Sequence, residues 1–430
     1  MSAGAPCYKI WAVWLCRIIA GASFVLSGWA KAIDPRGFAF KIEEYLSVWG
    51  LGNLLPDGMT GIIGCTISIF ELTIGILILT GSLRRSSAIC GLIMMAVWLP
   101  LTAYIVIADP VADCGCFGDF IVLSNTATFI KNILLTAVLI FCLIWYKAAS
   151  PLYRPGLQWL IPALTILYGL IISVIGWHIQ PIVDFRPYPV GSSLIDNGER
   201  GHITYNYFKN GEYKEFTLDE LPDTTWTFVS QNKSEINKPR ELTVFDGEDE
   251  ITEDLFGEDS PHQMIILVYP QPGLDDLLRS RMANEINEYA RGHGIEMIGL
   301  IAASGKSLEE WKNLARPEYE VYSADSTPLK QLVRGPIGIV YLRDGKVKWK
   351  RNFSTLPADI LMRTNPFDSV SVVDDGRVAG WLSGFYIFGL ILLLGISKLT
   401  TIKIRPPLRK KSNKSDKIEN VARSSDTGKA

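Results

Sequence analysis

Six stretches of the chain are hydrophobic over about the ~20 residues that a helix needs to cross a lipid bilayer. They are residues 10–32, 61–80, 86–108, 126–146, 157–178 and 381–399. In lipid only a helix or a closed barrel satisfies its own backbone polar groups, so this pattern predicts six membrane-spanning helices. The first stretch is too long for the apolar core of a signal peptide, and we expect it to be retained.

The region between the fifth and sixth stretches has the pattern of a water-soluble domain. Residues 203–208 and 213–218 flank Asn210-Gly211, which predicts a β-hairpin with a type I′ turn. Residues 263–269 and 295–301 are typical of short buried strands.

The sequence has the periodicity of a helix between these two strands and again after the second strand. An amphipathic helix is expected after residue 270, with one apolar face made of Leu274, Leu277, Leu278, Met282, Ile286 and Tyr289. Residues 308–314 predict a second helix, and Asp344-Gly345 a closing hairpin between residues 338–342 and 346–349. The order strand, helix, strand, helix, hairpin predicts an α/β layer.

Charge then indicates how the spans are oriented. With 42 basic and 44 acidic residues, the formal net charge of −2 gives no reason to expect nucleic-acid binding. Lysine and arginine gather in two connections and in the tail, as Arg84, Arg85, Lys147, Arg154, Lys403, Arg405, Arg409, Lys410, Lys411, Lys414 and Lys417. Segments rich in lysine and arginine stay in the cytoplasm. We therefore expect a bacterial inner-membrane protein with both termini on the cytoplasmic side and the soluble domain in the periplasm.

These patterns predict five parts. Residues 1–147 would form a four-span membrane domain, residues 148–180 a fifth span and residues 181–379 the outer-face soluble domain. Residues 380–400 would form the sixth span, and residues 401–430 a basic, disordered cytoplasmic tail.

The connection between the third and fourth spans holds two cysteines, Cys114 and Cys116, separated by Gly115. It is expected on the periplasmic side, where disulfides persist. A disulfide between cysteines one residue apart closes a small ring, and such a strained disulfide is oxidising. This favours thiol–disulfide exchange over a structural disulfide. Glycine between the cysteines permits the tight turn. The flanking Asp113 and Asp119 are expected to raise the thiol pKa. A static disulfide and a partial metal site remain alternatives.

Ionisable residues also occur in or next to the first two spans. Glu71 lies near mid-membrane, where burial costs at least a few kcal/mol unless the side chain is neutral, paired or facing a cavity. Lys31 and Asp34 mark the end of the first span, where they are expected to pair. Glu71 is thus either a functional residue or a protonated side chain bonded to a neighbouring helix. The remaining cysteines are expected to pack as small apolar residues: Cys7, Cys16, Cys65, Cys90 and Cys142.

Together these residues resemble the DoxX/MauE superfamily of four-helix membrane proteins, over about residues 10–147. The resemblance rests on Phe24, Ser27-Gly28, Lys31, Asp34-Pro35, the Glu71-Leu72-Thr73-Ile74-Gly75 stretch and Cys114-Gly115-Cys116-Phe117-Gly118-Asp119. MauE proteins are associated with methylamine utilisation. The resemblance implies that Cys114 and Cys116 are a redox pair that supports disulfide formation in an exported partner. Asp113, Gly115, Phe117, Gly118 and Asp119 would shape their loop.

The soluble domain looks like a thioredoxin-like fold from about residue 240. Arg334-Gly335-Pro336-Ile337 resembles the cis-proline site of that fold, with Pro336 as the cis proline. The position where such enzymes carry cysteines is instead Pro270-Gln271-Pro272-Gly273, and no cysteine follows Cys142. This domain therefore cannot exchange thiols itself.

The expected protein is a multi-pass α-helical membrane protein, a DoxX-like four-helix bundle with two further spans and a soluble α/β thioredoxin-like domain. Thiol–disulfide exchange at Cys114 and Cys116 is the leading hypothesis, with the lipid bilayer and an exported thiol protein as partners. A membrane quinone or a second thiol protein would stand at the other end. The alternatives are a non-catalytic scaffold whose outer domain binds a partner, and a transporter that uses Glu71 and Lys31.

Overall fold

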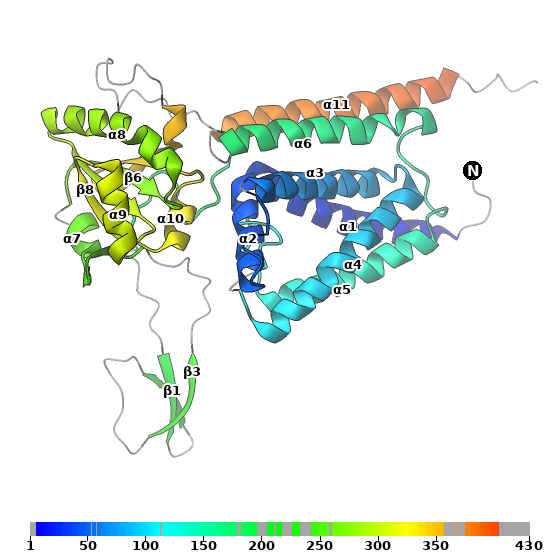
Figure 1. Cartoon of the computed structure of the whole chain (residues 1–430). Helices are drawn as coiled ribbons and strands as arrows, with labels where there is room; N and C mark the ends of the chain where they lie inside the picture. Colours follow the sequence, from blue (N-terminus) through cyan, green and yellow to red (C-terminus); the bar gives the residue numbers. More distant parts are fainter. Residues whose placement is uncertain are drawn as a thin grey trace, which may run out of the picture.

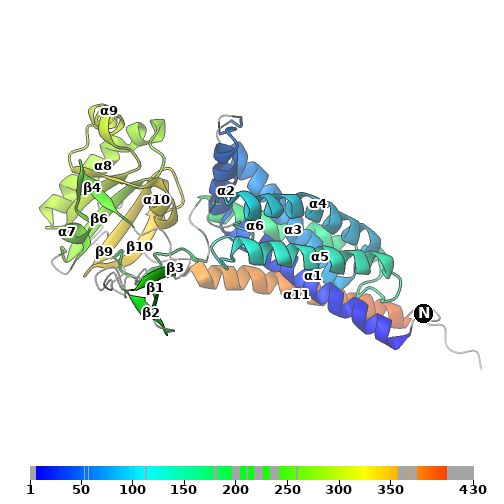
Figure 2. The same cartoon turned by 90° about the horizontal axis from the view of Figure 1, so that it is seen from below.

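The computed structural model describes residues 6–403 with several gaps. The gaps are residues 53, 57, 112–113, 179–180, 182, 196–203, 210–211, 217–225, 233–241, 258–259, 357–366 and 368–374. A long helical bundle and a sheet domain lie end to end, as both views show (Figures 1 and 2). Of the sequence predictions, Asp113, the Asn210-Gly211 turn and the tail from residue 404 lie outside the described residues.

Six described helices are long and apolar enough to cross a membrane. They are α1 (Cys7–Ile33), α3 (Met59–Thr80), α4 (Arg84–Ala108), α5 (Asn125–Ile144), α6 (Leu160–His178, preceded by the short helix η1, Pro155–Leu157) and α11 (Asp375–Lys403). All six overlap the predicted spans, which confirms a multi-pass membrane protein. α11 lies beside α6, where the Thr165 and Tyr386 hydroxyls are 2.7 Å apart (Figure 1).

The sequence pattern missed one helix of the bundle, α2 (Pro35–Val48), which crosses the end of the bundle nearest the sheet domain (Figure 1). Asp34 begins it by accepting a hydrogen bond from the Gly37 amide at 2.9 Å, and Pro35 occupies its first turn, where no amide hydrogen is needed. Its few buried residues are Pro35, Phe38 and Ala39. α2 escaped prediction because it is too short and too polar to be recognised as a span.

Glycine allows α1 and α3 to pack closely. A Cβ atom on Gly28 would lie 2.4 Å from the Leu72 backbone nitrogen, and one on Gly75 would lie 2.6 Å from the Val25 nitrogen. Small residues at such contacts let two helix backbones approach in a membrane, where packing replaces the hydrophobic effect. This contact fixes how residues of α1 face residues of α3.

The outer domain is built on a seven-stranded mixed sheet in the order β10-β9-β6-β7-β8-β4-β5. Its strands are β4 (Val244–Asp246), β5 (Asp249–Glu250), β6 (Gln263–Tyr269), β7 (Glu296–Ile301), β8 (Glu320–Ala324), β9 (Gly338–Arg343) and β10 (Lys346–Asn352). β6, β7 and β8 are parallel, whereas β9, β10, β4 and β5 pair antiparallel. Its helices are α7 (Thr252–Phe256), α8 (Leu274–Gly292), α9 (Gly305–Ala315), α10 (Ser326–Leu332) and η3 (Phe353–Thr355).

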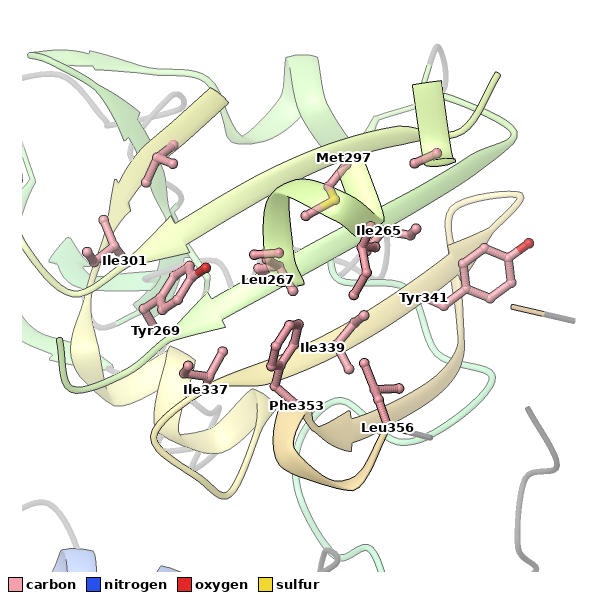
Figure 3. Packing of buried hydrophobic residues seen from close by; sticks show 14 of the residues in the cluster. Ile265, Leu267, Tyr269, Met297, Ile301, Ile337, Ile339, Tyr341, Phe353 and Leu356 are labelled. Atoms are coloured by element: carbon pink, nitrogen blue, oxygen red, sulfur yellow. The ribbon is translucent and has the colours of Figure 1, made fainter. Parts of the chain in front are cut away.

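Alternation along β6 divides the core of this domain into two layers. Ile265, Leu267 and Tyr269 belong to the cluster that α8 and α9 cover (Figure 3). Met264 and Val268 belong to the cluster on the other face of the sheet, which α10 covers. Side chains of successive strand residues point to opposite faces, and helices cover both faces of this central strand, so β6 is apolar from Met264 to Tyr269.

A separate three-stranded sheet, β2-β1-β3, projects from the outer domain (Figure 1). β1 (Thr204–Lys209) and β2 (Glu212–Phe216) form the predicted hairpin, with Lys209 opposite Glu212. β3 (Thr227–Asn232) pairs with the other edge of β1. The predicted β6, α8, β7, α9 and β9–β10 hairpin are also present, whereas β4, β5, α7, β8 and α10 were not predicted, because most of them are too short to show a period.

Two expectations for the outer domain are wrong. Leu278 of α8 was expected in the apolar face, but it is 81% exposed because it points away from the sheet on which Ile286 packs. Pro336 follows a trans peptide bond, not a cis one. Only ~5% of X–Pro bonds in folded proteins are cis, so the sequence Gly335-Pro336 alone carries little preference for that isomer.

Replacing Gly75 with alanine tests the α1–α3 contact. The added Cβ meets the backbone of α1 and cannot be accommodated by a side-chain rotation, so we expect Gly75→Ala to destabilise the detergent-solubilised protein by about 1–3 kcal/mol. Thermal unfolding followed by tryptophan fluorescence measures this change. Gly389→Ala on α11 is the matched control, because nothing lies within 4 Å of its added Cβ. Equal stability of the two variants would show that α1 and α3 are not packed this closely.

Candidate functional site

The loop between α4 and α5 holds the two cysteines as neighbouring free thiols. The Sγ atoms of Cys114 and Cys116 are 2.8 Å apart. Gly115 between them has a φ of 64°, and a Cβ there would lie 3.1 Å from the Lys41 side chain of α2. The left-handed backbone favours glycine at this position, and the Lys41 side chain leaves little room for a Cβ. The Gly118 amide closes the turn by donating to the Gly115 carbonyl at 3.0 Å.

Side chains of α1 and α2 hold the loop by its backbone carbonyls. The Ser27 hydroxyl donates to the Cys116 carbonyl at 2.5 Å, and the Tyr45 hydroxyl donates to the Cys114 carbonyl at 2.9 Å. Ser27 appeared in the sequence only as part of a span-end motif, and nothing in the sequence pointed to Tyr45. Their role depends on α2, which the hydrophobic pattern did not reveal.

Lys31 and Glu71 form a buried ion pair directly behind Ser27. The Lys31 Nζ lies 2.8 Å from Glu71 Oε2 and donates to the Ser27 hydroxyl at 3.1 Å. Glu71 is therefore paired, one of the states in which a mid-membrane carboxylate is tolerated. The expected pairing of Lys31 with Asp34 is wrong, because Lys31 points into the bundle toward α3 rather than toward the helix end. A chain of contacts thus runs from Glu71 through Lys31 and Ser27 to Cys116.

The two thiols have opposite acidities. The hydrogen bond with Cys116 and burial raise the pKa of Cys114 well above its ordinary range. The hydrogen bond from Cys114 lowers the pKa of Cys116 to about 7, against the effect of burial and with the help of Lys131 and Lys31. This differs from the expectation that flanking aspartates raise the pKa of both thiols. Asp119 is instead turned toward an arginine of the outer domain, so lysines dominate the field at Cys116.

Behind the pair lies a cavity of about 220 Å³ inside the bundle. It is lined by residues of α1 to α5 and of the loop, which are Ser23, Phe24, Ser27, Lys31, Phe38, Ile42, Tyr45, Leu46, Trp49, Ile63, Ile67, Glu71, Met95, Val97, Trp98, Leu101, Cys114, Gly115, Cys116, Lys131, Asn132 and Leu135. Figure 1 shows α4 and α5 diverging from α1 and α3 toward α2, and the lining residues of the cavity come from these five helices and the loop. Both cysteines and the Lys31–Glu71 pair therefore face one shared space.

The outer domain is fastened to the same loop by Arg334. Its guanidinium Nε lies 2.8 Å from Asp34 Oδ2, and its Nη2 is bonded to Asp119. Burial alone would lower the pKa of Arg334, but the charges of Asp34 and Asp119 raise it above its ordinary value. Gln271 adds a hydrogen bond of 3.2 Å to Glu43 of α2. No sequence signal could have found this contact, because Arg334 lies 300 residues after Asp34.

Phe117, Cys16 and Cys142 each contact another side chain of the membrane domain. Phe117 receives the Lys131 ammonium over its ring, 4.4 Å from the ring centre. Cys16 of α1 and Cys142 of α5 are hydrogen-bonded to each other inside the bundle. In the described part of the chain, no group of three histidine, cysteine or acidic side chains gathers as metal ligands.

Comparison with known proteins gives matches to parts of the chain. Residues 9–145 match the family described as methylamine utilisation protein MauE, so the bundle contains a MauE family domain. Residues 202–238, which include the three-stranded sheet, match a domain of unknown function, DUF8463. Protein TlpB of Flavobacterium psychrophilum is 29% identical over 132 residues, which cover 29% of this chain and 34% of TlpB. The chain thus matches about a third of that relative's length. No solved structure matches the chain.

The acidity of Cys116 can be measured in a variant that retains only Cys114 and Cys116. Because the thiolate is the nucleophile, we expect the rate of Cys116 alkylation by iodoacetamide to rise with pH through a midpoint of about 7. Cys114→Ala removes the S–H donor, so the midpoint should move upward. Peptide mass spectrometry of the alkylated protein reports each site. A midpoint near the ordinary ~8.5 in both proteins would contradict this description of the pair.

Arg334→Met tests whether the outer domain holds the loop. The substitution leaves Asp34 and Asp119 without their cation, and because Asp119 is partly exposed we expect a loss of about 2–3 kcal/mol, below the ~3–5 of a fully buried pair. Hydrogen exchange of residues 114–120 should accelerate. Arg281→Met is the control, since Arg281 pairs with Glu285 on the exposed face of α8. Unchanged exchange in Arg334→Met would show that the loop is held by the bundle alone.

Proposed function

We propose that the MauE family domain of this membrane protein carries out thiol–disulfide exchange with an exported protein through Cys114 and Cys116. One observation carries this proposal: two free thiols lie 2.8 Å apart with opposite shifts in pKa. A disulfide needs sulfur atoms ~2.05 Å apart, so the pair is close to the geometry of the oxidised form. A pair in which one thiol ionises near neutral pH suits reversible chemistry better than a static link.

The acidities indicate the direction of exchange. In disulfide exchange the sulfur with the lower pKa leaves more readily, so a partner thiolate would attack Cys114 Sγ and release Cys116 as a thiolate. The second thiol of the partner then attacks the mixed disulfide, forms the partner's disulfide and frees Cys114. Two electrons and two protons pass from the partner dithiol to the loop.

The distribution of charge supports a periplasmic location for this chemistry. Arg84 begins α4 at the end of the bundle opposite the cysteine loop, where it donates to the Ala149 carbonyl at 2.8 Å. Arg17 donates to the same carbonyl at 3.2 Å. Because arginine and lysine at helix ends stay in the cytoplasm, we assign the loop and the outer domain to the periplasmic side of a bacterial inner membrane.

We assign the outer domain a positioning role rather than a catalytic one. The strand order β7-β6-β9-β10, with α8 after β6 and α9 after β7, supports a thioredoxin-like arrangement. The segments after β6 and before β9, where that fold would present its active site, carry Gln271 and Arg334, which contact the membrane domain. No cysteine occurs after Cys142, so this domain cannot accept electrons through a disulfide. Its role is to hold the loop through these contacts.

The exchange is tested in native membranes with a variant that retains only Cys114 and Cys116. We expect a reduced dithiol peptide to convert the oxidised pair to two thiols, with stoichiometric oxidation of the peptide, as counted by thiol labelling. Cys116→Ser, incubated with a one-cysteine peptide that is disulfide-linked to glutathione, should accumulate a mixed disulfide on Cys114. The Cys114 thiol displaces one half of that disulfide, and no Cys116 thiol remains to release the other half. The control that lacks both cysteines should form none. A pair that stays oxidised under mild reductant and forms no mixed disulfide would favour the alternative, a scaffold with a structural loop disulfide.

A further inference from the structure

The proposed exchange leaves the loop with two electrons that must be passed on. An outer-domain thiol cannot accept them, because the sequence has no cysteine after Cys142. Cys114 and Cys116 instead form part of the wall of the 220 Å³ cavity, so a molecule in that cavity would touch the redox pair directly. The electron acceptor is therefore expected to bind in this cavity.

The size of the cavity selects a single substituted ring. An engineered protein cavity of ~150 Å³ binds benzene, so about 220 Å³ accommodates a six-membered ring with several small substituents. The aromatic side chains of Phe24, Phe38 and Trp98 line it and can stack on a flat ring. A long chain attached to the ring would not fit and would have to leave through an opening.

That opening has the character of the lipid-facing surface. At the rim, Val97 of α4 is 62% exposed and Trp49 of α2 is 45% exposed, and both are apolar. α4 is a membrane-spanning helix and α2 crosses its outer end, so a hydrophobic chain passing between them would enter the bilayer. The ligand is therefore one that is dissolved in the membrane.

The polar groups on the wall are mainly hydrogen-bond donors. Lys31 donates to Glu71 and to Ser27 and, as an ammonium, carries a third N–H. The ammonium of Lys131 also lines the wall, whereas the Asn132 amide already donates to the Thr102 hydroxyl at 3.3 Å. The indole Nε1 of Trp98 is buried and has no hydrogen-bond partner among the described residues. Hydrogen-bond donors that remain available on the wall fit a ligand that carries carbonyl oxygens, because these oxygens accept hydrogen bonds.

We propose that the cavity binds the ring of an isoprenoid quinone, which takes the two electrons from Cys114 and Cys116. This inference rests on the proposed exchange. It combines a ring-sized space, donors for carbonyl oxygens, an apolar opening toward lipid and a dithiol in the wall. A quinone is the membrane-soluble, two-electron acceptor that has all the matching properties.

The electrons and protons of this step balance. The Cys116 thiolate adds to a ring carbon of the quinone, and the electron pair displaced onto a ring oxygen is neutralised by a proton. Cys114 Sγ then attacks Cys116 Sγ and gives up its proton. The S–S bond forms, the C–S bond breaks, and its electron pair remains on the ring, whose second oxygen takes up a proton. The dithiol becomes a disulfide and the quinone a hydroquinone, while Lys31 stabilises the negative oxygen between proton transfers.

The test uses the full-length protein that retains only Cys114 and Cys116, reduced and freed of reductant without air. The probes are decylubiquinone and menadione, and hydroquinone formation is followed by absorbance together with the thiol count. We expect saturable oxidation of the pair with stoichiometric hydroquinone. Val97→Trp narrows the opening and Leu135→Phe fills the interior, so each should raise the half-saturating quinone concentration on the order of tenfold or more. Ile107→Trp, at an exposed α4 position outside the cavity lining, should change nothing.

The outcomes separate this inference from the proposed function. A pair that a dithiol peptide reduces, but that neither quinone reoxidises, overturns the quinone site and leaves the exchange intact. Oxidation that does not saturate, or that Val97→Trp and Leu135→Phe leave unchanged, shows an unspecific reaction of a thiolate and also overturns the site. A pair that no dithiol reduces overturns the exchange itself, and with it the role of a quinone as acceptor. Both cavity variants must still be reduced by the dithiol peptide at the parental rate, which excludes misfolding as the cause.

Discussion

The structure of the membrane domain depends on one buried ion pair. Lys31 and Glu71 lie 2.8 Å apart between α1 and α3, both almost completely buried. Neither charge could be accommodated alone in such a place, since breaking a buried pair costs ~3–5 kcal/mol. Their attraction therefore constrains the register of the two helices, which the close contacts at Gly28 and Gly75 also require. Because Lys31 also donates to Ser27, and Ser27 to the Cys116 carbonyl, the same pair positions the cysteine loop.

A second cluster of charges links the two domains at the same loop. Arg334 of the outer domain joins Asp34, which caps α2, to Asp119, which ends the cysteine turn. The outer domain thus reaches the membrane domain through polar contacts made by the segments after β6 and before β9. The buried arginine makes this interface specific in geometry, because the planar guanidinium binds carboxylates with fixed directions.

The two cysteines differ chiefly because they are hydrogen-bonded to each other. The hydrogen bond from Cys114 favours the thiolate of Cys116, and Lys131 and Lys31 add to this effect. Cys114 is the donor of that bond and is buried, so it remains the protonated member of the pair. The cavity gives both sulfurs access to the interior of the bundle. An exported dithiol on one side and a membrane-dissolved acceptor on the other would then meet at a single pair of sulfur atoms.

The sequence by itself determined the six spans and the main strands and helices of the outer domain, and it singled out Cys114 and Cys116, whose thiols are neighbours in the structure. These follow from local pattern, since hydrophobic length, periodicity and a two-cysteine motif are properties of short segments. Only the tertiary structure decided that Lys31 pairs with Glu71 rather than Asp34, that Arg334 meets Asp34 and Asp119, and that a cavity lies behind the loop. Helix α2 shows the limit of prediction from local pattern, because it lacks the hydrophobic length of a membrane span. Its role arises from the residues that it brings to the cysteine loop. Contacts between residues 40 to 300 positions apart depend on how helices pack, which no local pattern encodes.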